Sequence, residues 1–104
     1  MTYKEWCEAF TLLNSDIKKL LKKACALNKF KMKGKQKEYN LMLPETQVDL
    51  VYARKVLDKL DSQSYWHKQY LDEDKWSKYK EGISGIFVYL DTLIPERAVK
   101  QWQQ

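Results

Sequence analysis

The sequence predicts a mainly α-helical fold, a bundle of three to four helices that forms a single helical domain over residues 1–104. Apolar residues recur at alternating steps of three and four along both the first and the last third of the chain, the period of an amphipathic helix. Only three glycines and two prolines interrupt the 104 residues. Hydrophobic residues make up 44% of the chain and aromatic residues 13% of the chain, which is enough for one hydrophobic core.

The first helix is predicted to begin at Tyr3. Thr2 and Glu5 have the spacing of a capping box, in which a hydroxyl and a carboxylate satisfy the free amides at a helix start. An apolar stripe follows, so we expect a helix of about 25 residues with one face in the core. The stripe consists of Trp6, Phe10, Leu13, Ile17, Leu20, Ala24 and Leu27, and the lysines expected on the opposite side are Lys4, Lys18, Lys19, Lys22 and Lys23.

The segment from residue 29 to 43 has a different pattern. Lysines occupy every odd position from Lys29 to Lys37, and this alternation favours an extended backbone. A turn at Gly34-Lys35 would place Phe30 opposite Tyr39 in a small β-hairpin. A two-stranded ribbon is marginally stable, so a basic loop between the first two helices remains the alternative.

Two further long helices are predicted after this segment. Pro44 suits the first turn of the second helix, which is expected to run to about Leu60. A polar break and a short aromatic turn over residues 65–70 lead to an acidic helix start at Asp72-Glu73-Asp74. The third helix ends at Pro95, and one final turn is expected over residues 96–102.

The second helix should bury Leu50, Ala53, Val56, Leu57 and Leu60, with Val48 and Tyr52 widening that face. The third should bury Trp76, Tyr79, Ile83, Ile86, Leu90 and Leu93, with Phe87 and Ile94 broadening the stripe and Gly82 and Gly85 allowing a close backbone approach.

The strongest functional signal is a segregated positive charge. Between residues 17 and 37 there are nine lysines and no acidic residue: Lys18, Lys19, Lys22, Lys23, Lys29, Lys31, Lys33, Lys35 and Lys37. Such focusing attracts polyanions, and Phe30 and Tyr39 are candidate stacking platforms for unpaired bases. Lysine acts as a point charge on phosphate, so the sequence predicts a small basic accessory protein that binds DNA or RNA without strong sequence preference. The preference for lysine over arginine suits an AT-rich genome, such as that of a phage or plasmid.

A second class of function competes with nucleic-acid binding. Small helical domains rich in aromatic residues also act as protein-binding inhibitors or immunity-type factors, in anti-defence systems or bacteriocin immunity. Exposed aromatic side chains make rigid anchors in such interfaces. The candidates for one protein partner are Tyr65, Trp66, Tyr70 and Trp102. Near-heptad spacing also permits a homodimer of helical hairpins.

Catalysis is not expected. The single His67 has no cysteine or acid at ligand spacing, and no phosphate-binding glycine loop or nucleophile turn is present, so we expect no enzyme, metal or cofactor. Cys7 and Cys25 are predicted to lie about 27 Å apart on one helix, too far for a disulfide. No run of about 18 apolar residues or secretory signal is found, which predicts a cytoplasmic protein with no membrane span.

Overall fold

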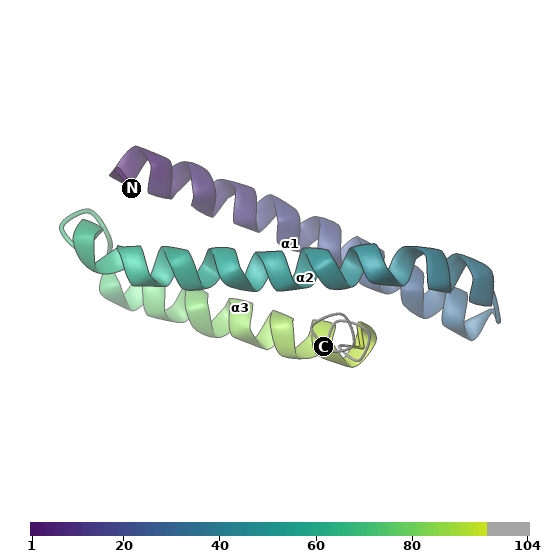
Figure 1. Ribbon diagram of the computed structural model, residues 1–104. Coiled ribbons are helices and arrows are strands. Elements are labelled where there is room, and N and C mark those ends of the chain that lie inside the picture. The colour runs from purple at the N-terminus through teal and green to yellow at the C-terminus, as the bar shows by residue number, and fades with distance from the viewer. Residues whose placement is uncertain (96–104) are drawn as a thin grey trace, which may run out of the picture.

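The computed structural model describes residues 1–95 as three long helices and one short one (Figure 1). These are α1 (Tyr3–Met32), α2 (Gln36–Ser64), the 3₁₀ helix η1 (Tyr65–His67) and α3 (Glu73–Leu93). Successive long helices run in opposite directions, and the body measures 51 × 28 × 19 Å. The mainly helical prediction is confirmed, with three long helices and no strand within residues 1–95. The final turn predicted over residues 96–102 lies outside the described residues.

α1 begins where the capping box predicts. The Thr2 hydroxyl accepts a hydrogen bond from the Glu5 amide at 3.1 Å, and the Glu5 carboxylate accepts one from the Thr2 amide at 3.2 Å. Hydrogen bonds from the Thr2 amide and then the Thr2 hydroxyl lower the pKa of Glu5. Two amides that have no partner inside the helix are thereby satisfied, which fixes the first turn.

The prediction of a β-hairpin or basic loop over residues 29–43 is wrong. α1 continues to Met32 and α2 begins at Gln36, so only a short turn separates two helices. Gly34 adopts a φ of +70°, which glycine takes without strain, and the Lys35 amide donates to the Phe30 carbonyl at 2.8 Å. Phe30 and Tyr39 are therefore not cross-strand neighbours. Lysine is a good helix former. At the exposed end of a helix neither side of the backbone is buried, so the alternation of lysines does not indicate a strand.

Pro44 lies inside α2 and not at its start. Its ring nitrogen cannot donate the helical hydrogen bond, a loss that normally disfavours proline in a helix interior. The helix continues because the residues that follow are anchored: Thr46 and Gln47 are buried, and Leu50 packs in the core. Tertiary packing thus outweighs the local preference. At its other end α2 includes the polar segment 61–64 that we predicted as a break.

The core combines one stripe from each long helix. All predicted stripe residues of α1 are buried except the half-buried Phe10. Trp6 donates its indole N–H to the Leu60 carbonyl at 2.9 Å, and the Tyr79 hydroxyl donates to Asn14 at 2.7 Å. The fully or nearly fully buried apolar residues of the other helices are Leu50, Ala53, Leu57, Leu60, Trp76, Ile83, Phe87, Leu90 and Ile94.

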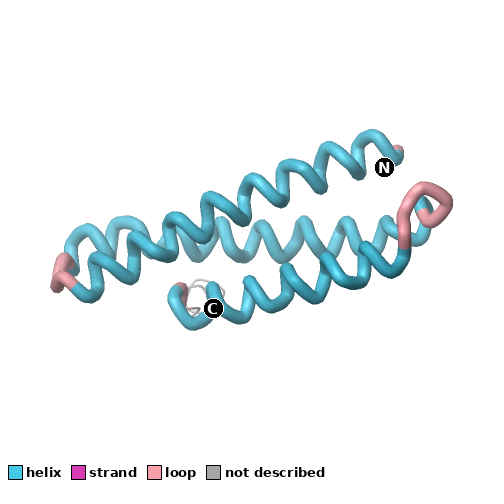
Figure 2. Tube along the Cα trace, turned by 180° about the vertical axis from the view of Figure 1, so that it is seen from behind, coloured by secondary structure: helices cyan, strands magenta, loops and turns pink. Residues whose placement is uncertain are grey.

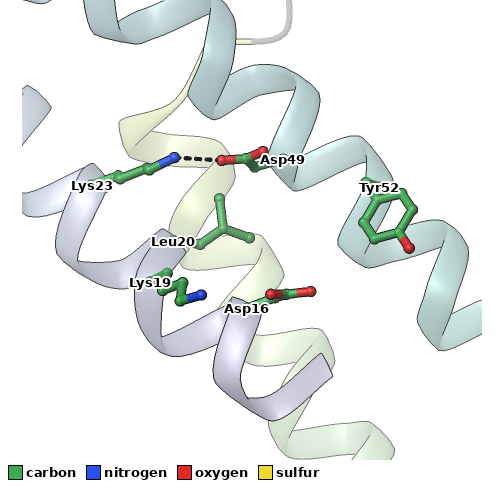
Figure 3. A pocket seen from close by; sticks show the side chains of 6 residues that line it. All are labelled: Asp16, Lys19, Leu20, Lys23, Asp49 and Tyr52. Carbon is green, nitrogen blue, oxygen red and sulfur yellow. Dashed lines mark hydrogen bonds and ion pairs between the residues drawn. The ribbon is translucent and has the colours of Figure 1, made fainter. Parts of the chain in front are cut away.

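Two predictions about helix faces are wrong. Val48 and Tyr52 are 52% and 61% exposed, because α3 packs on the other side of the α1–α2 pair (Figure 3). Gly82 and Gly85 make no close approach, since a Cβ at either position would meet nothing within 4 Å.

α3 covers only part of the α1–α2 pair. It starts at Asp72, whose carboxylate accepts hydrogen bonds from the amides of Asp74 and Lys75, as the acidic helix start predicts. Its far end is tied to α2 by a hydrogen bond from the Gln47 side chain to the Pro95 carbonyl. Beyond that level α1, α2 and their turn project past α3 (Figure 2). We call residues 28–45 the hairpin tip. None of its side chains is fully buried.

Candidate nucleic-acid interface

The lysine-rich segment lies on the second half of α1, the turn and the start of α2. Within residues 1–95, eight of its nine lysines form no ion pair, and these eight are exposed. The only acidic residue of the hairpin tip apart from Glu45 at its boundary is Glu38. The positive charge is therefore spatially separated from carboxylates along most of this end of the molecule.

Four of these lysines form a line along α1 and its C-terminal cap. Lys18, Lys22 and Lys29 of α1 and the C-cap residue Lys33 follow one another at steps of four, seven and four, which places them on the same side of the helix. They span about 22 Å along the helix axis. We call this set the α1 lysine row. Cys25 belongs to the same face, and its thiol is free and exposed.

Lys23 departs from the prediction that it lies opposite the core-facing side. Its ammonium group contacts Asp49 at 2.6 Å and Glu45 at 2.7 Å, both on α2 (Figure 3 shows the Asp49 contact). Hydrogen bonds to Asp49 and then to Glu45 raise the pKa of Lys23. This lysine stabilises the pairing of α1 with α2, and its charge is already compensated.

A hollow of about 310 Å³ lies beside this contact, between α1 and α2 (Figure 3). Its lining mixes charges of both signs, because Asp16 and Asp49 stand beside Lys19 and Lys23. Such a lining does not favour a phosphate chain. This hollow therefore carries charges of both signs, whereas the α1 lysine row carries only positive charge.

The two predicted stacking platforms are poorly placed for that role. Phe30 and Tyr39 are both half-buried, and Tyr39 packs against the core. The apolar side chains that the hairpin tip does expose are Met32 and Leu41, at 79% and 72%. Neither carries a ring on which a base can stack.

The predicted protein-binding aromatics gather at the opposite end of the molecule. Tyr65, Trp66 and Tyr70 are 64%, 71% and 60% exposed, and we call these three residues the aromatic end. The Tyr65 and Trp66 rings meet edge to face at 5.6 Å, and Tyr70 stacks on Tyr3 at 4.7 Å. Trp102, the fourth candidate, lies outside the described residues.

The histidine, the cysteines and the acidic start of α3 form no metal or catalytic cluster within residues 1–95. Within residues 1–95 no cluster of three or more histidine, cysteine or acidic side chains is arranged to hold a metal ion. Asp72 caps α3, and His67 is buried beside the Tyr3 ring, with 5.8 Å between the ring centroids. Cys7 and Cys25 are both free thiols, as their predicted separation requires.

One exposed surface was missed by the sequence patterns. Leu12 is 64% exposed, and with Tyr52 and the half-buried Val56 it lines an apolar hollow of about 350 Å³ between α1 and α2. The exposure of Leu12 could have been predicted, because this residue lies off the α1 stripe. That of Tyr52 depends on where α3 packs. Homodimerisation remains a prediction.

Comparison with protein-family models, with curated proteins and with solved structures gave no match. None of the helices within residues 1–95 has both the length and the hydrophobicity needed to cross a bilayer.

Proposed function

We propose that this protein binds nucleic acid through phosphate contacts made by the α1 lysine row and the lysines of the hairpin tip. The observation that supports the proposal is the set of eight exposed lysines that form no ion pair within residues 1–95. A lysine ammonium group contacts phosphate as a point charge. It lacks the paired donors with which an arginine makes two hydrogen bonds to one base. Binding is therefore expected to show little sequence preference.

The proposal predicts a strong dependence of affinity on salt. Each phosphate neutralised by a lysine releases condensed counterions, so the logarithm of affinity falls linearly with the logarithm of salt concentration. Contacts from about four to six lysines give a slope of roughly −3 to −5. Fluorescence anisotropy with random-sequence oligonucleotides across a salt series measures this slope. Absence of binding at low salt would refute the proposal.

Charge reversal locates the interface. The triple substitution Lys29→Glu, Lys31→Glu and Lys33→Glu should weaken binding strongly and leave the melting temperature nearly unchanged, because exposed charges contribute little to stability. The matched control reverses the same number of exposed lysines elsewhere, with Lys55→Glu, Lys75→Glu and Lys78→Glu. Equal losses of affinity in both variants would show that net charge alone, without a defined interface, accounts for binding.

The exposure of the aromatic end favours a second candidate function, binding of one protein partner as an inhibitor or immunity-type factor. Trp66 is the most exposed of its three rings, and large aromatic side chains contribute disproportionately to interfaces. Trp66→Ala should abolish co-purification of a partner from the native host without lowering the melting temperature. Tyr89→Ala, which removes a 52% exposed ring from α3, is the control. Retention of the partner by Trp66→Ala would exclude the aromatic end as the interface.

A further inference from the structure

We infer that the nucleic acid bound by this protein is double-stranded, and that the duplex lies along the α1 lysine row. This inference rests on the proposed function, because it names the form of nucleic acid that the same lysines contact. Three features of the structure carry it: the position of the aromatic rings, the rigidity of the row and the distribution of carboxylates.

The first feature is the lack of a stacking surface among the lysines. Proteins that bind single strands combine positive charge with exposed rings on which successive bases stack. Phe30 and Tyr39 are half-buried. Within residues 1–95 the largely exposed rings are Tyr52, Tyr65, Trp66, Tyr70 and Tyr89, all outside residues 18–37. A single strand would thus gain phosphate contacts here without the stacking energy that usually accompanies them.

The second feature is the rigid geometry of the α1 lysine row. The row extends about 22 Å from Lys18 to the C-cap Lys33, and the helix that carries it has its inner face packed in the core as far as Leu27. A duplex presents its phosphates in fixed positions and carries one charge per about 1.7 Å of axis. Because the backbone of this helix is already ordered, only the lysine side chains lose freedom on meeting such an array, whereas a flexible strand must itself be ordered as well.

The third feature decides which face of the hairpin meets the duplex. The groove between α1 and α2 carries Asp16 and Asp49, which would repel phosphate. Along α1 no acidic residue follows Asp16, so the outer face from Lys18 onwards is uniformly positive. Cys25 stands in the middle of that face and is exposed. Its thiol therefore reports directly on whether this face is covered.

The first experiment compares a short random-sequence DNA duplex with one of its separated strands by anisotropy, under identical salt. We expect the duplex to bind at least about tenfold more tightly. For four phosphates neutralised, the salt slope should be about −3.6 on the duplex and about −2.8 on the strand. Equal or tighter binding of the single strand would overturn the inference and leave the proposed function standing. Failure of both probes to bind at low salt would overturn the proposed function itself.

The second experiment locates the duplex on the full-length protein. Alkylation of Cys25 by a maleimide, followed by mass spectrometry of its peptide, should slow several-fold when the DNA duplex is bound. Cys7 is the internal reference, since it lies on the same helix about 27 Å away and outside the α1 lysine row. Duplex binding that leaves the rate at Cys25 unchanged, or slows both cysteines equally, would overturn the placement along this row.

The row itself is tested by Lys18→Gln and Lys22→Gln together. If both lysines contact the duplex, the salt slope should become less steep by about two, because each lost phosphate contact removes about one unit. Lys75→Gln and Lys78→Gln on α3 form the matched control. An unchanged slope in the Lys18/Lys22 variant would show that the duplex does not follow this face.

Discussion

The two halves of the α1–α2 pair differ in how they are stabilised. The half covered by α3 contains every fully buried residue of both helices, including Leu13, Leu20 and Ala53, whereas the hairpin tip contains none. The tip also carries five of the eight exposed lysines of the lysine-rich segment that form no ion pair. The core and the part of the proposed binding surface that lies at the tip thus occupy different regions, so charges can be altered at the tip without a large effect on the core.

The largest expected effect tests this division directly. Leu20 is 1% exposed in the covered half, so Leu20→Ala should lower the free energy of unfolding by about 2–5 kcal/mol through lost burial and the cavity left behind. Met32→Ala, at a 79% exposed position of the hairpin tip, should change it by less than about 0.5 kcal/mol. Urea denaturation measures both values. Similar losses in the two variants would mean that the tip is packed as firmly as the covered half.

An intermediate effect is expected at Pro44, near the boundary of the two halves. Proline in a helix interior costs up to about 3 kcal/mol relative to alanine, because it lacks the amide donor and its ring crowds the preceding turn. Pro44→Ala should therefore raise the free energy of unfolding, in the same urea assay. Pro95→Ala, just beyond α3, is the control and should change little. Destabilisation by Pro44→Ala would indicate that the proline is needed for the local path of α2.

The smallest effect concerns the covered half at low pH. A hydrogen bond from Lys80, at 3.0 Å, and a weaker contribution from the Trp76 indole lower the pKa of Asp61. A carboxyl whose pKa is lower in the folded state stabilises the protein above the pKa of the unfolded chain, about 3.9, and this contribution disappears as the pH falls through the folded value. Asp61 is 47% exposed, so we expect only a few tenths of a kcal/mol.

Melting temperatures from pH 6 down to about pH 2 should show this contribution. Asp61→Asn should be slightly less stable than the wild type near neutral pH, and the difference should vanish at the acid end. Asp58→Asn, at an exposed position on the same helix, is the control. A constant difference across the whole range would exclude the ion pair as its cause.

The sequence predicted the fold best where residues are buried. The α1 stripe follows from burial with a 3.6-residue period, and the starts of α1 and α3 follow from side chains that satisfy free amides, so all three could be predicted. The β-hairpin prediction failed because an exposed helix end imposes no such pattern, so the alternating lysines were equally compatible with a helix. Local preference predicts Pro44 at a helix start, because it gives no indication of the packing around Thr46 and Gln47.

The candidate site was only partly predictable for the same reason. The concentration of lysines is a property of the sequence, but the contact of Lys23 with Asp49 depends on the register of two helices that are joined by a turn. The exposure of Tyr52 and Val48 depends on the side to which α3 packs. The charge density along the chain can therefore be predicted from the sequence. Identifying the charges that have no partner of opposite sign requires the tertiary structure.

The turn at Gly34 has a consequence for how the chain folds. If the pairing of α1 with α2 began at this turn, the contacts of the hairpin tip would form first. These contacts bury little apolar surface, so they cannot offset the loss of conformational entropy when the backbone becomes ordered. We therefore expect the folding nucleus to form farther along the pair, around Leu20 and Leu50, at the cost of closing a larger loop. Substitutions there should slow refolding, whereas substitutions beside Gly34 should chiefly change the rate of unfolding.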